Sequence, residues 1–209
     1  MGVNLQKGQK VDLTKGNAGL RGVMVGLGWD EVQQQQKSGG FFGSLFGGSS
    51  APQQDIDCDA SAFLIKNGRI EGLQDIVFYN NLRHASGTVL HQGDNLTGAG
   101  EGDDEQIFVN LQAVPQYYEK IVFVVTIYQA RQRHQHFGLV RNCFIRLVDV
   151  DTNRELCRYN LSENYDNYTA MVFGEVYRHN GEWKFGAIGQ PTQDNSVIEI
   201  AARFGLPVN

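Results

Sequence analysis

The stretch Gly22–Trp29 reads GVMVGLGW and alternates large apolar residues with smaller ones. Successive side chains of a β-strand point to opposite faces, so this period of two predicts a strand with one heavy face and one nearly bare face. A bare face lets another backbone or sheet approach closely. The heavy positions are Val23, Val25, Leu27 and Trp29, and the light face holds Met24, Gly26 and Gly28.

Strand patterns continue outward from this stretch along most of the chain. Asn67-Gly68 and Asn180-Gly181 are typical of type I′ hairpin turns. Val114–Lys120 is expected to be a short helical or turn segment, and a helical spacing near the end stops at Gly205. Further strands are predicted at Ala60–Ile65, Ile76–Tyr79, Val89–His91, Ile107–Leu111, Ile121–Tyr128, Phe144–Val150, Glu155–Leu161, Ala170–Arg178 and Trp183–Ile188.

Nine or ten strands with tight turns and few helices predict an all-β protein, a two-sheet β-sandwich with a few short helices. We expect one domain over residues 1–209, interrupted by an insertion rich in Gln, Gly, Phe and Ser at about 33–54. This insertion contains Phe41, Phe42 and Phe46. These rings either pack back onto the domain or form an apolar segment for a partner or a membrane surface.

The bulk composition narrows the class of protein. A net charge of -5 and a pI near 5.5 argue against a general nucleic-acid binder and suit a protein with cation sites. Three scattered cysteines without a CxxC pair fit a reducing compartment. The N-terminus has no signal-peptide pattern, and the longest apolar run, Ile121–Ile127, is too short to span a bilayer. We therefore expect a soluble, cytoplasmic protein.

Two acidic stretches carry the candidate chemistry, Asp55–Ala62 and Gly93–Glu105. The second contains five carboxylates and four glycines, and no Lys or Arg occurs between His84 and Glu119. Crowded like charges repel one another, and a hard cation would relieve them. Calcium takes about six to eight oxygen ligands, which favours it over magnesium here. Acidic surface loops without a metal remain the alternative.

The first stretch begins like an EF-hand, D-x-D-x-D, but Ala60 and Lys66 stand where the glycine and the bidentate glutamate belong. It is better interpreted as the entry to a strand, whose alternation places Asp57 and Asp59 on one face, toward the second loop. We expect two calcium ions. The candidate ligands are Asp30, Asp57, Asp59, Asp94, Asn95, Asp103, Asp104 and Glu105.

At these same residues the chain resembles the TerD family over nearly its whole length, the insertion and the last turn excepted. The resemblance implies a calcium-binding β-sandwich with a bacterial role in tellurite resistance and stress, and other Ter-family proteins as partners, at the inner membrane. Two departures are the long insertion, similar to TerX or TerZ members, and the basic segment Ala130–His136. The matching pieces are 26–30 (GLGWD), 57–64 (DCDASAFL), 78–81 (FYNN), 91–98 (HQGDNLTG), 102–105 (GDDE), 120–123 (KIVF), 140–142 (VRN), 171–175 (MVFGE) and 181–185 (GEWKF).

The leading functional hypothesis is a non-enzymatic calcium-dependent scaffold or sensor, with no catalytic residue, nucleic acid or small-molecule substrate. One alternative is calcium-dependent docking to an anionic membrane, with Phe41, Phe42 and Phe46 inserting. Another is a metal-dependent phosphate-ester hydrolase, since clustered carboxylates also hold catalytic metals. The absence of a Walker loop and of a G-x-S-x-G elbow argues against the hydrolase. The oligomeric state stays open.

Overall fold

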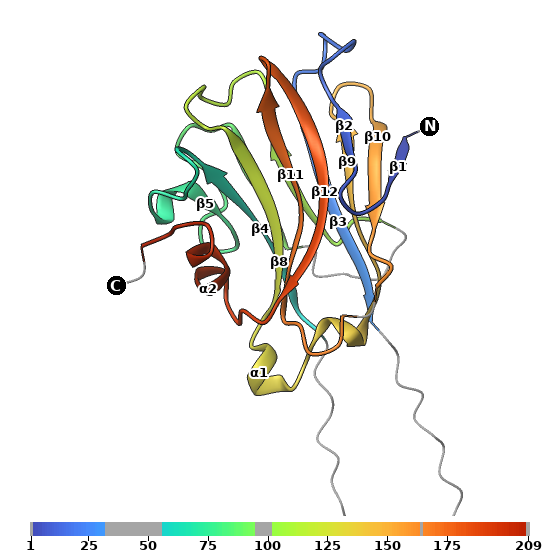
Figure 1. Ribbon diagram of the computed structural model, residues 1–209, viewed down its shortest axis with the longest axis vertical. Helices are drawn as coiled ribbons and strands as arrows, with labels where there is room; N and C mark the ends of the chain where they lie inside the picture. Colours follow the sequence, from blue (N-terminus) through green and yellow to red (C-terminus); the bar gives the residue numbers. More distant parts are fainter. Residues whose placement is uncertain (1, 32–55, 95–101, 164, 208–209) are drawn as a thin grey trace, which may run out of the picture.

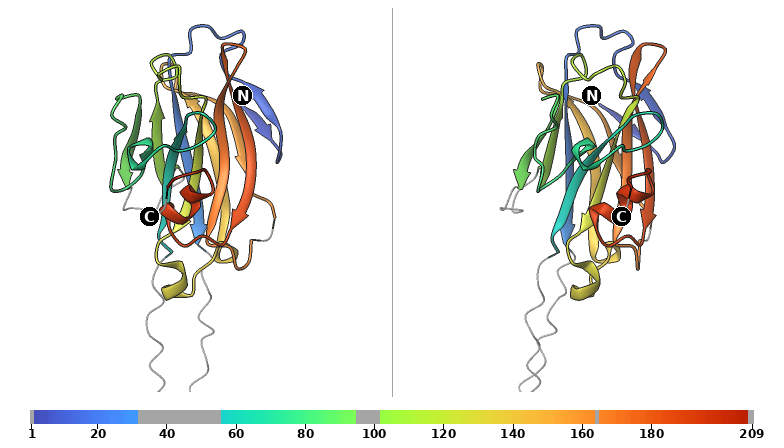
Figure 2. Two further views of the ribbon diagram at one scale, coloured as in Figure 1. Left: turned by 60° about the vertical axis from the view of Figure 1, so that its left-hand side comes forward. Right: turned by 90° about the vertical axis from the view of Figure 1, so that its left-hand side faces the viewer.

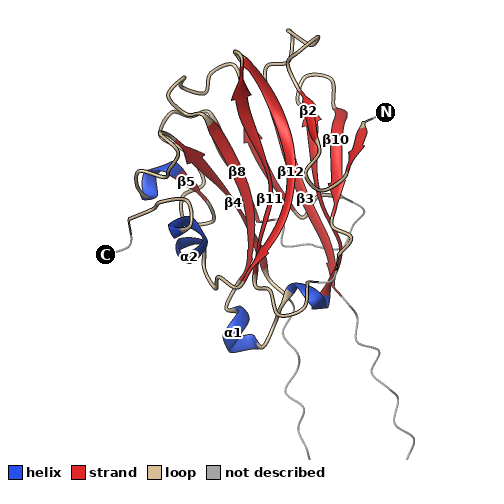
Figure 3. Cartoon of the chain, viewed as in Figure 1, coloured by secondary structure: helices blue, strands red, loops and turns tan. Residues whose placement is uncertain are grey.

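The computed structural model describes residues 2–31, 56–94, 102–163 and 165–207, which form two packed six-stranded sheets (Figures 1 and 3). The predicted β-sandwich is confirmed. The insertion at 33–54, with Phe41, Phe42 and Phe46, lies outside the described residues. In order across sheet A lie β1 (Val3–Leu5), β10 (Arg154–Asn160), β9 (Val140–Asp149), β3 (Val23–Glu31), β7 (Glu105–Val109) and β6 (Val89–Asp94). Sheet B contains β2 (Lys10–Asp12), β12 (Glu182–Thr192), β11 (Ala170–His179), β8 (Lys120–Ile127), β4 (Cys58–Ile65) and β5 (Ile76–Val77).

The neighbouring strands pair antiparallel, apart from β1, which runs parallel to β10. The two N-terminal strands, with three residues each, were too short for the sequence pattern to reveal. Both predicted I′ turns form: φ is +52° at Asn67 and +76° at Gly68, and +53° at Asn180 and +81° at Gly181. These positive angles explain why Asn-Gly stands at both places.

The main core lies between the sheets, and β4 shows how alternation builds it. Cys58, Ala60, Ala62 and Leu64 belong to the core between the sheets, whereas Phe63 and Ile65 belong to a second cluster on the outer face of sheet B. The helix α2 (Val197–Ala202) packs over that face (Figure 2). Its N-cap Ser196 accepts a hydrogen bond from the Glu199 amide, so the predicted C-terminal helix is confirmed with a defined start.

The bare face of β3 receives two close neighbours. A side chain at Gly26 would collide with the carboxylate of Asp103, and one at Gly28 would collide with the ring of Phe144. The light face of this strand therefore does permit a close approach, as its sequence predicts: the neighbours are the Phe144 ring of β9 and the backbone and side chains of residues 102–103, and not a second sheet.

The remaining elements are short. The predicted segment Val114–Lys120 contains a turn and no helix, and its last residue, Lys120, already begins β8 (Lys120–Ile127). The structure adds α1 (Ala130–Arg133) and the 3-10 turns η1 (Leu73–Asp75) and η2 (Phe137–Leu139). None of the helices in the described ranges is long and apolar enough to cross a membrane.

Candidate metal centre

Asp30, Asp57, Asp59, Asp103, Asp104 and Glu105, the predicted ligands whose side chains the structure describes, come from the end of β3 and the starts of β4 and β7, at the end of the sandwich near α1 (Figure 1). Leu27 of β3 is opposite Glu105 at the start of β7, and the amide of Asp104 donates a hydrogen bond to the Leu27 carbonyl (2.8 Å). The second acidic stretch is thereby attached to β3, and Asp30 lies further along the same strand.

Asp103 is neutralised by an arginine from a distant part of the chain. The Nε and Nη2 atoms of Arg146 donate to its two carboxylate oxygens at 2.7 and 3.1 Å, and Gln106 donates at 3.0 Å. The Asp103 side chain is 1% exposed. This hydrogen-bonded pairing raises the pKa of Arg146. The local sequence showed no cation near the loop because Arg146 comes from β9, on the far side of β3.

Glu105 joins the two acidic stretches. Its buried carboxylate accepts a hydrogen bond from the backbone amide of Ala60 in β4 and lies 3.6 Å from Nε2 of His91. The same Nε2 is 3.2 Å from the Ala60 carbonyl. Burial pulls the pKa of His91 down, but the hydrogen bond and charge of Glu105 outweigh it and the pKa is raised. His91 is not among the predicted site residues, because only the sheet register brings it to this carboxylate.

Asp104 lies beside the end of β3, near Asp30. Oδ2 of Asp104 accepts the amide of Trp29 at 2.7 Å, and Oδ2 of Asp30 accepts from the Asn142 side chain at 2.7 Å. Burial raises the pKa of Asp104, and the negative charges of Asp30 and Asp103 raise it further. Within the described residues, neither Oδ1 atom accepts a hydrogen bond.

The other candidates are less closely assembled. Asp57 and Asp59 alternate with the core residues Cys58 and Ala60, so their side chains project from the outer face of β4. The negative charge of Asp59 is the second cause, after burial, that raises the pKa of Tyr79. Among the described residues, the Ala60 backbone amide donates a hydrogen bond to Glu105 of the second stretch. The strand β6 ends at Asp94, opposite Glu105. The Asp94 side chain and Asn95 lie outside the described residues.

The donor set therefore fits a hard cation only in part. In the ranges that the structure describes, no three His, Cys, Asp or Glu side chains are grouped closely enough to hold a metal ion. Asp30 and Asp104 offer carboxylate oxygens, the donor type that calcium and magnesium prefer. Asp103 and Glu105 already bind other groups of the protein. A complete coordination sphere would need further oxygens from the neighbouring loop.

Comparison with known proteins gives consistent matches along the chain. The TerD domain model matches residues 1–204. The Bacillus subtilis general stress protein 16U is 49% identical over 209 residues, all of both chains. Stress response protein SCP2 of the same organism is 46% identical over 98% of this chain and 100% of its own. Tellurium resistance protein TerD of Serratia marcescens is 46% identical over 99% of this chain and 98% of its own.

One solved structure shares the fold at low identity. A homologue of telluride resistance protein from Streptomyces coelicolor A3(2) superimposes with a TM-score of 0.61 at 20% identity. The match covers 90% of this chain and 99% of that one. At this identity, the structural similarity supports the shared β-sandwich fold and nothing about function.

Proposed function

The chain belongs to the TerD domain family, and on that premise we propose that it is a calcium-binding module of a bacterial tellurium-resistance and stress-response system. Its relatives are named for resistance and stress rather than for a reaction. The proposed role is that of a non-enzymatic cytoplasmic scaffold or sensor, with other Ter-family proteins as its partners.

The observation that carries the proposal is the juxtaposition of Asp30 and Asp104. Their like charges contribute to the raised pKa of Asp104, after burial. Among the described residues, each accepts one hydrogen bond through Oδ2 and none through Oδ1, and we propose Oδ1 as the cation ligand. Asp94 and Asn95, in the loop that leads from β6 to β7, are proposed to complete this site. Calcium is favoured over magnesium because it accepts more protein oxygens and a less regular geometry.

For Asp103 and Glu105 we propose a supporting role, because both carboxylates already have partners within the protein. A cation close to Asp103 would be repelled by the guanidinium of Arg146, which already binds both of its oxygens. Glu105 is buried against the Ala60 amide and His91. We therefore interpret both as residues that position the loop, and not as primary ligands.

A second ion is proposed at Asp57 and Asp59. Asp59 lies in β4 and Asp57 directly precedes that strand, so in extended backbone their Cα atoms are about 7 Å apart. This separation allows both carboxylates to reach a single ion. Because the pair projects from the outer face of β4, this site is separate from the one at Asp104.

Calcium binding to the folded chain would order the acidic end of the sandwich and prepare it for a partner. Binding to the native state alone adds about 2.7 kcal/mol to the free energy of unfolding when free ligand is a hundredfold above Kd. Residues of the protein itself orient the two proposed ligands Asp104 and Asp30. Trp29 and Asn142 hold Asp104 and Asp30 through hydrogen bonds, so the two carboxylates are already placed before an ion arrives.

Titration calorimetry and thermal melts with calcium, magnesium or a chelator test the proposal. We expect calcium-dependent heat, a raised melting temperature and a weaker response to magnesium. Asp104→Asn keeps an acceptor for Trp29, so it is expected to weaken calcium binding at least tenfold, with little change in the metal-free melt. If the wild-type protein gives neither heat nor a shift in melting with calcium, the proposal is wrong.

Two matched variants separate ligands from supporting residues. Asp103→Asn removes the charge paired with Arg146 and should lower the metal-free unfolding free energy by about 1–3 kcal/mol. Asp151→Asn removes an equal charge from a surface pair with Arg21 and should leave calcium affinity unchanged. Equal loss of calcium affinity in Asp104→Asn and Asp151→Asn would show that only net charge matters.

A further inference from the structure

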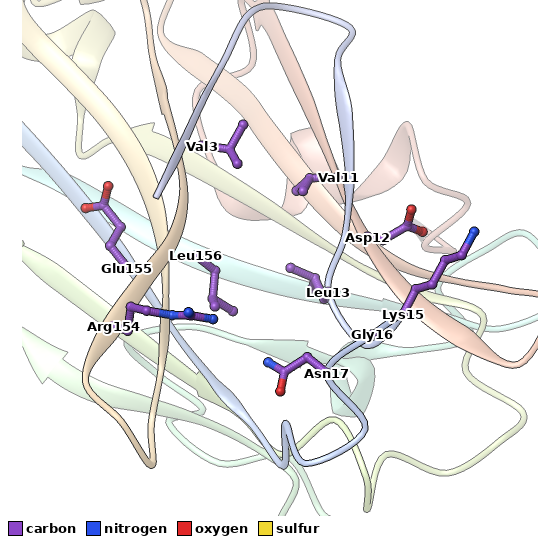
Figure 4. A pocket seen from close by; sticks show the side chains of 10 residues that line it. All are labelled: Val3, Val11, Asp12, Leu13, Lys15, Gly16, Asn17, Arg154, Glu155 and Leu156. Atoms are coloured by element: carbon purple, nitrogen blue, oxygen red, sulfur yellow. The ribbon is translucent and has the colours of Figure 1, made fainter. Parts of the chain in front are cut away.

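A cleft opens at the edge of the sandwich where the chain first passes between the two sheets. β1 is the outermost strand of sheet A and β2 the outermost strand of sheet B. The cleft between them has a volume of about 270 Å³, slightly below the usual range of ligand pockets, about 300–1,000 Å³. Figure 4 shows its lining, which comes from β1, β2, the segment that follows β2 and the start of β10.

One part of the cleft is apolar and is formed by four aliphatic side chains, Val3, Val11, Leu13 and Leu156, while most of the other lining residues are polar or charged. Val3 of β1 is 50% exposed, although it is a large aliphatic residue. Val11 and Leu156 are partly buried against the core between the sheets, and Leu13 belongs to that core. The cleft is thus a lateral opening that leads toward the interior of the sandwich. Burial of an apolar ligand group against these side chains would be favourable.

Among the described residues, the charged groups at the rim leave two cations without an ion pair, Lys15 and Arg154. The two acidic residues already have cationic partners: Asp12 pairs with Lys184 at 2.9 Å, and Glu155 lies 3.6 Å from Arg146 and 3.9 Å from Arg158. Arg154 makes no ion pair with any residue that the structure describes.

The directions of the side chains distinguish two cations at this rim. In Figure 4, Arg154 extends from β10 across the cleft toward Leu13 and Asn17. Lys15 and Glu155 point away from the space between the strands. A planar guanidinium over an apolar wall suits a carboxylate, because it donates two parallel hydrogen bonds. The side-chain amide of Asn17 adds a further donor on the same side.

We propose that this edge cleft binds a small amphipathic organic anion, with its carboxylate on Arg154 and Asn17 and its hydrocarbon body against Val3, Val11 and Leu156. The volume suits a short aliphatic or single-ring acid rather than a nucleotide. This binding does not depend on the calcium sites, because none of their residues lines the cleft. It also departs from the expectation, based on sequence, that the chain takes no small molecule.

Amide chemical-shift perturbation in the full-length protein tests the proposal, with hexanoate as the probe. We expect saturable shifts at residues 3, 11–17 and 154–156 at millimolar concentration, unchanged by a chelator. Hexanamide tests the need for the anion and inorganic phosphate tests the need for the hydrocarbon, so both should bind much more weakly. Binding of hexanamide or phosphate as tight as hexanoate would overturn the assignment, as would the absence of shifts in the cleft.

Two variants at the same rim provide the matched comparison. Arg154→Gln and Lys15→Gln each remove one positive charge, but only Arg154 points into the cleft. A charge-assisted pair is worth about tenfold in affinity or more, so Arg154→Gln should weaken hexanoate binding by that factor while Lys15→Gln has little effect. Thermal melts establish that both variants are folded. If hexanoate binding is weakened equally in both variants, the attraction is general and electrostatic, and the proposal of a specific site is wrong.

Discussion

At the residue scale, Gly26 shows how the absence of a side chain becomes a structural requirement. The carboxylate of Asp103 occupies the space beside its Cα, where Arg146 and Gln106 hold it. Gly26 is therefore needed for the position of the Asp103 carboxylate as well as for the strand β3. It allows a negative charge to be buried against the sheet beside its cationic partner.

Gly26→Ala is accordingly expected to destabilise the protein. The added methyl group must displace Asp103 from Arg146, and overpacking of this kind costs about 1–3 kcal/mol. Urea unfolding measures the loss. Gly186→Ala in β12 is the matched control, since a methyl group there meets its nearest neighbour at 3.7 Å, an ordinary contact. Equal costs in the two variants would contradict the role given to Gly26.

A second residue-scale feature is a buried chain of polar side chains under the 84–88 turn. The Tyr118 hydroxyl donates to Asp75 at 2.6 Å and lies 3.1 Å from Nε2 of His84, whose Nδ1 is 2.7 Å from the Ser86 hydroxyl. Burial lowers the pKa of His84, although the charge and hydrogen bonding of Asp75 partly oppose it. A neutral His84 can donate from Nε2 to the Tyr118 hydroxyl and accept at Nδ1 from the Ser86 hydroxyl, so each of these polar groups has a hydrogen-bond partner.

This lowered pKa predicts a defined dependence of stability on pH. Below pH 6.5 the unfolded chain protonates His84 while the folded chain does not, so this residue's contribution to stability falls as pH falls toward its native pKa. The cost of His84→Gln should therefore be larger at pH 7.5 than at pH 5.5. Urea unfolding at both values measures it, with exposed His179→Gln as the control. A cost that is constant or grows on acidification would contradict the assignment.

At the element scale, α2 matters because sheet B has apolar residues on both faces. Phe63, Ile65 and Val124 face outward, and α2 packs over them with Ile200 fully buried. The two strands β4 and β8 consequently have almost continuous apolar sequences, whereas an exposed sheet face would show polar alternation. A helix of only six residues is stable here because of that packing rather than its own propensity.

Ile200→Ala should cost about 2–5 kcal/mol of unfolding free energy, the range for buried large-to-small substitutions. Ile198→Ala, on the same helix, removes the same atoms from a partly buried position and should cost clearly less. Denaturant titration compares the two variants directly. If Ile198→Ala costs as much as Ile200→Ala, the loss reflects helix formation and not cover of the sheet.

At the scale of the whole molecule, residues 3–12 join the two layers. β1 pairs with β10 at the edge of sheet A, and β2 pairs with β12 at the edge of sheet B. Backbone hydrogen bonds between Gly8 and Ala187, and between Ala187 and Gln9, hold the connecting turn against β12. One short segment therefore covers an edge of each sheet, and uncovered edges are templates for pairing with other chains.

Removal of residues 2–12 should expose β10 and β12 as new edges. We expect a lower melting temperature and association that increases with protein concentration, because unpaired strand edges and the apolar walls behind them become accessible. Light scattering after size-exclusion chromatography, together with thermal melts, measures both. A truncated chain that stays monomeric with an unchanged melting temperature would show that β1 and β2 neither stabilise the sandwich nor prevent its association.

By itself, the sequence determined the fold class, most strands, both Asn-Gly hairpins, the C-terminal helix and the concentration of carboxylates in two loops. All of these are local patterns of period two, turn chemistry or composition, which a reader of the chain can see. Only the tertiary structure decided how the carboxylates are used. Strand order and register bring Arg146 to Asp103, the Ala60 amide to Glu105, and Asp30 beside Asp104. Partners so far apart in the chain are set by which strands pair, and no local pattern encodes that choice.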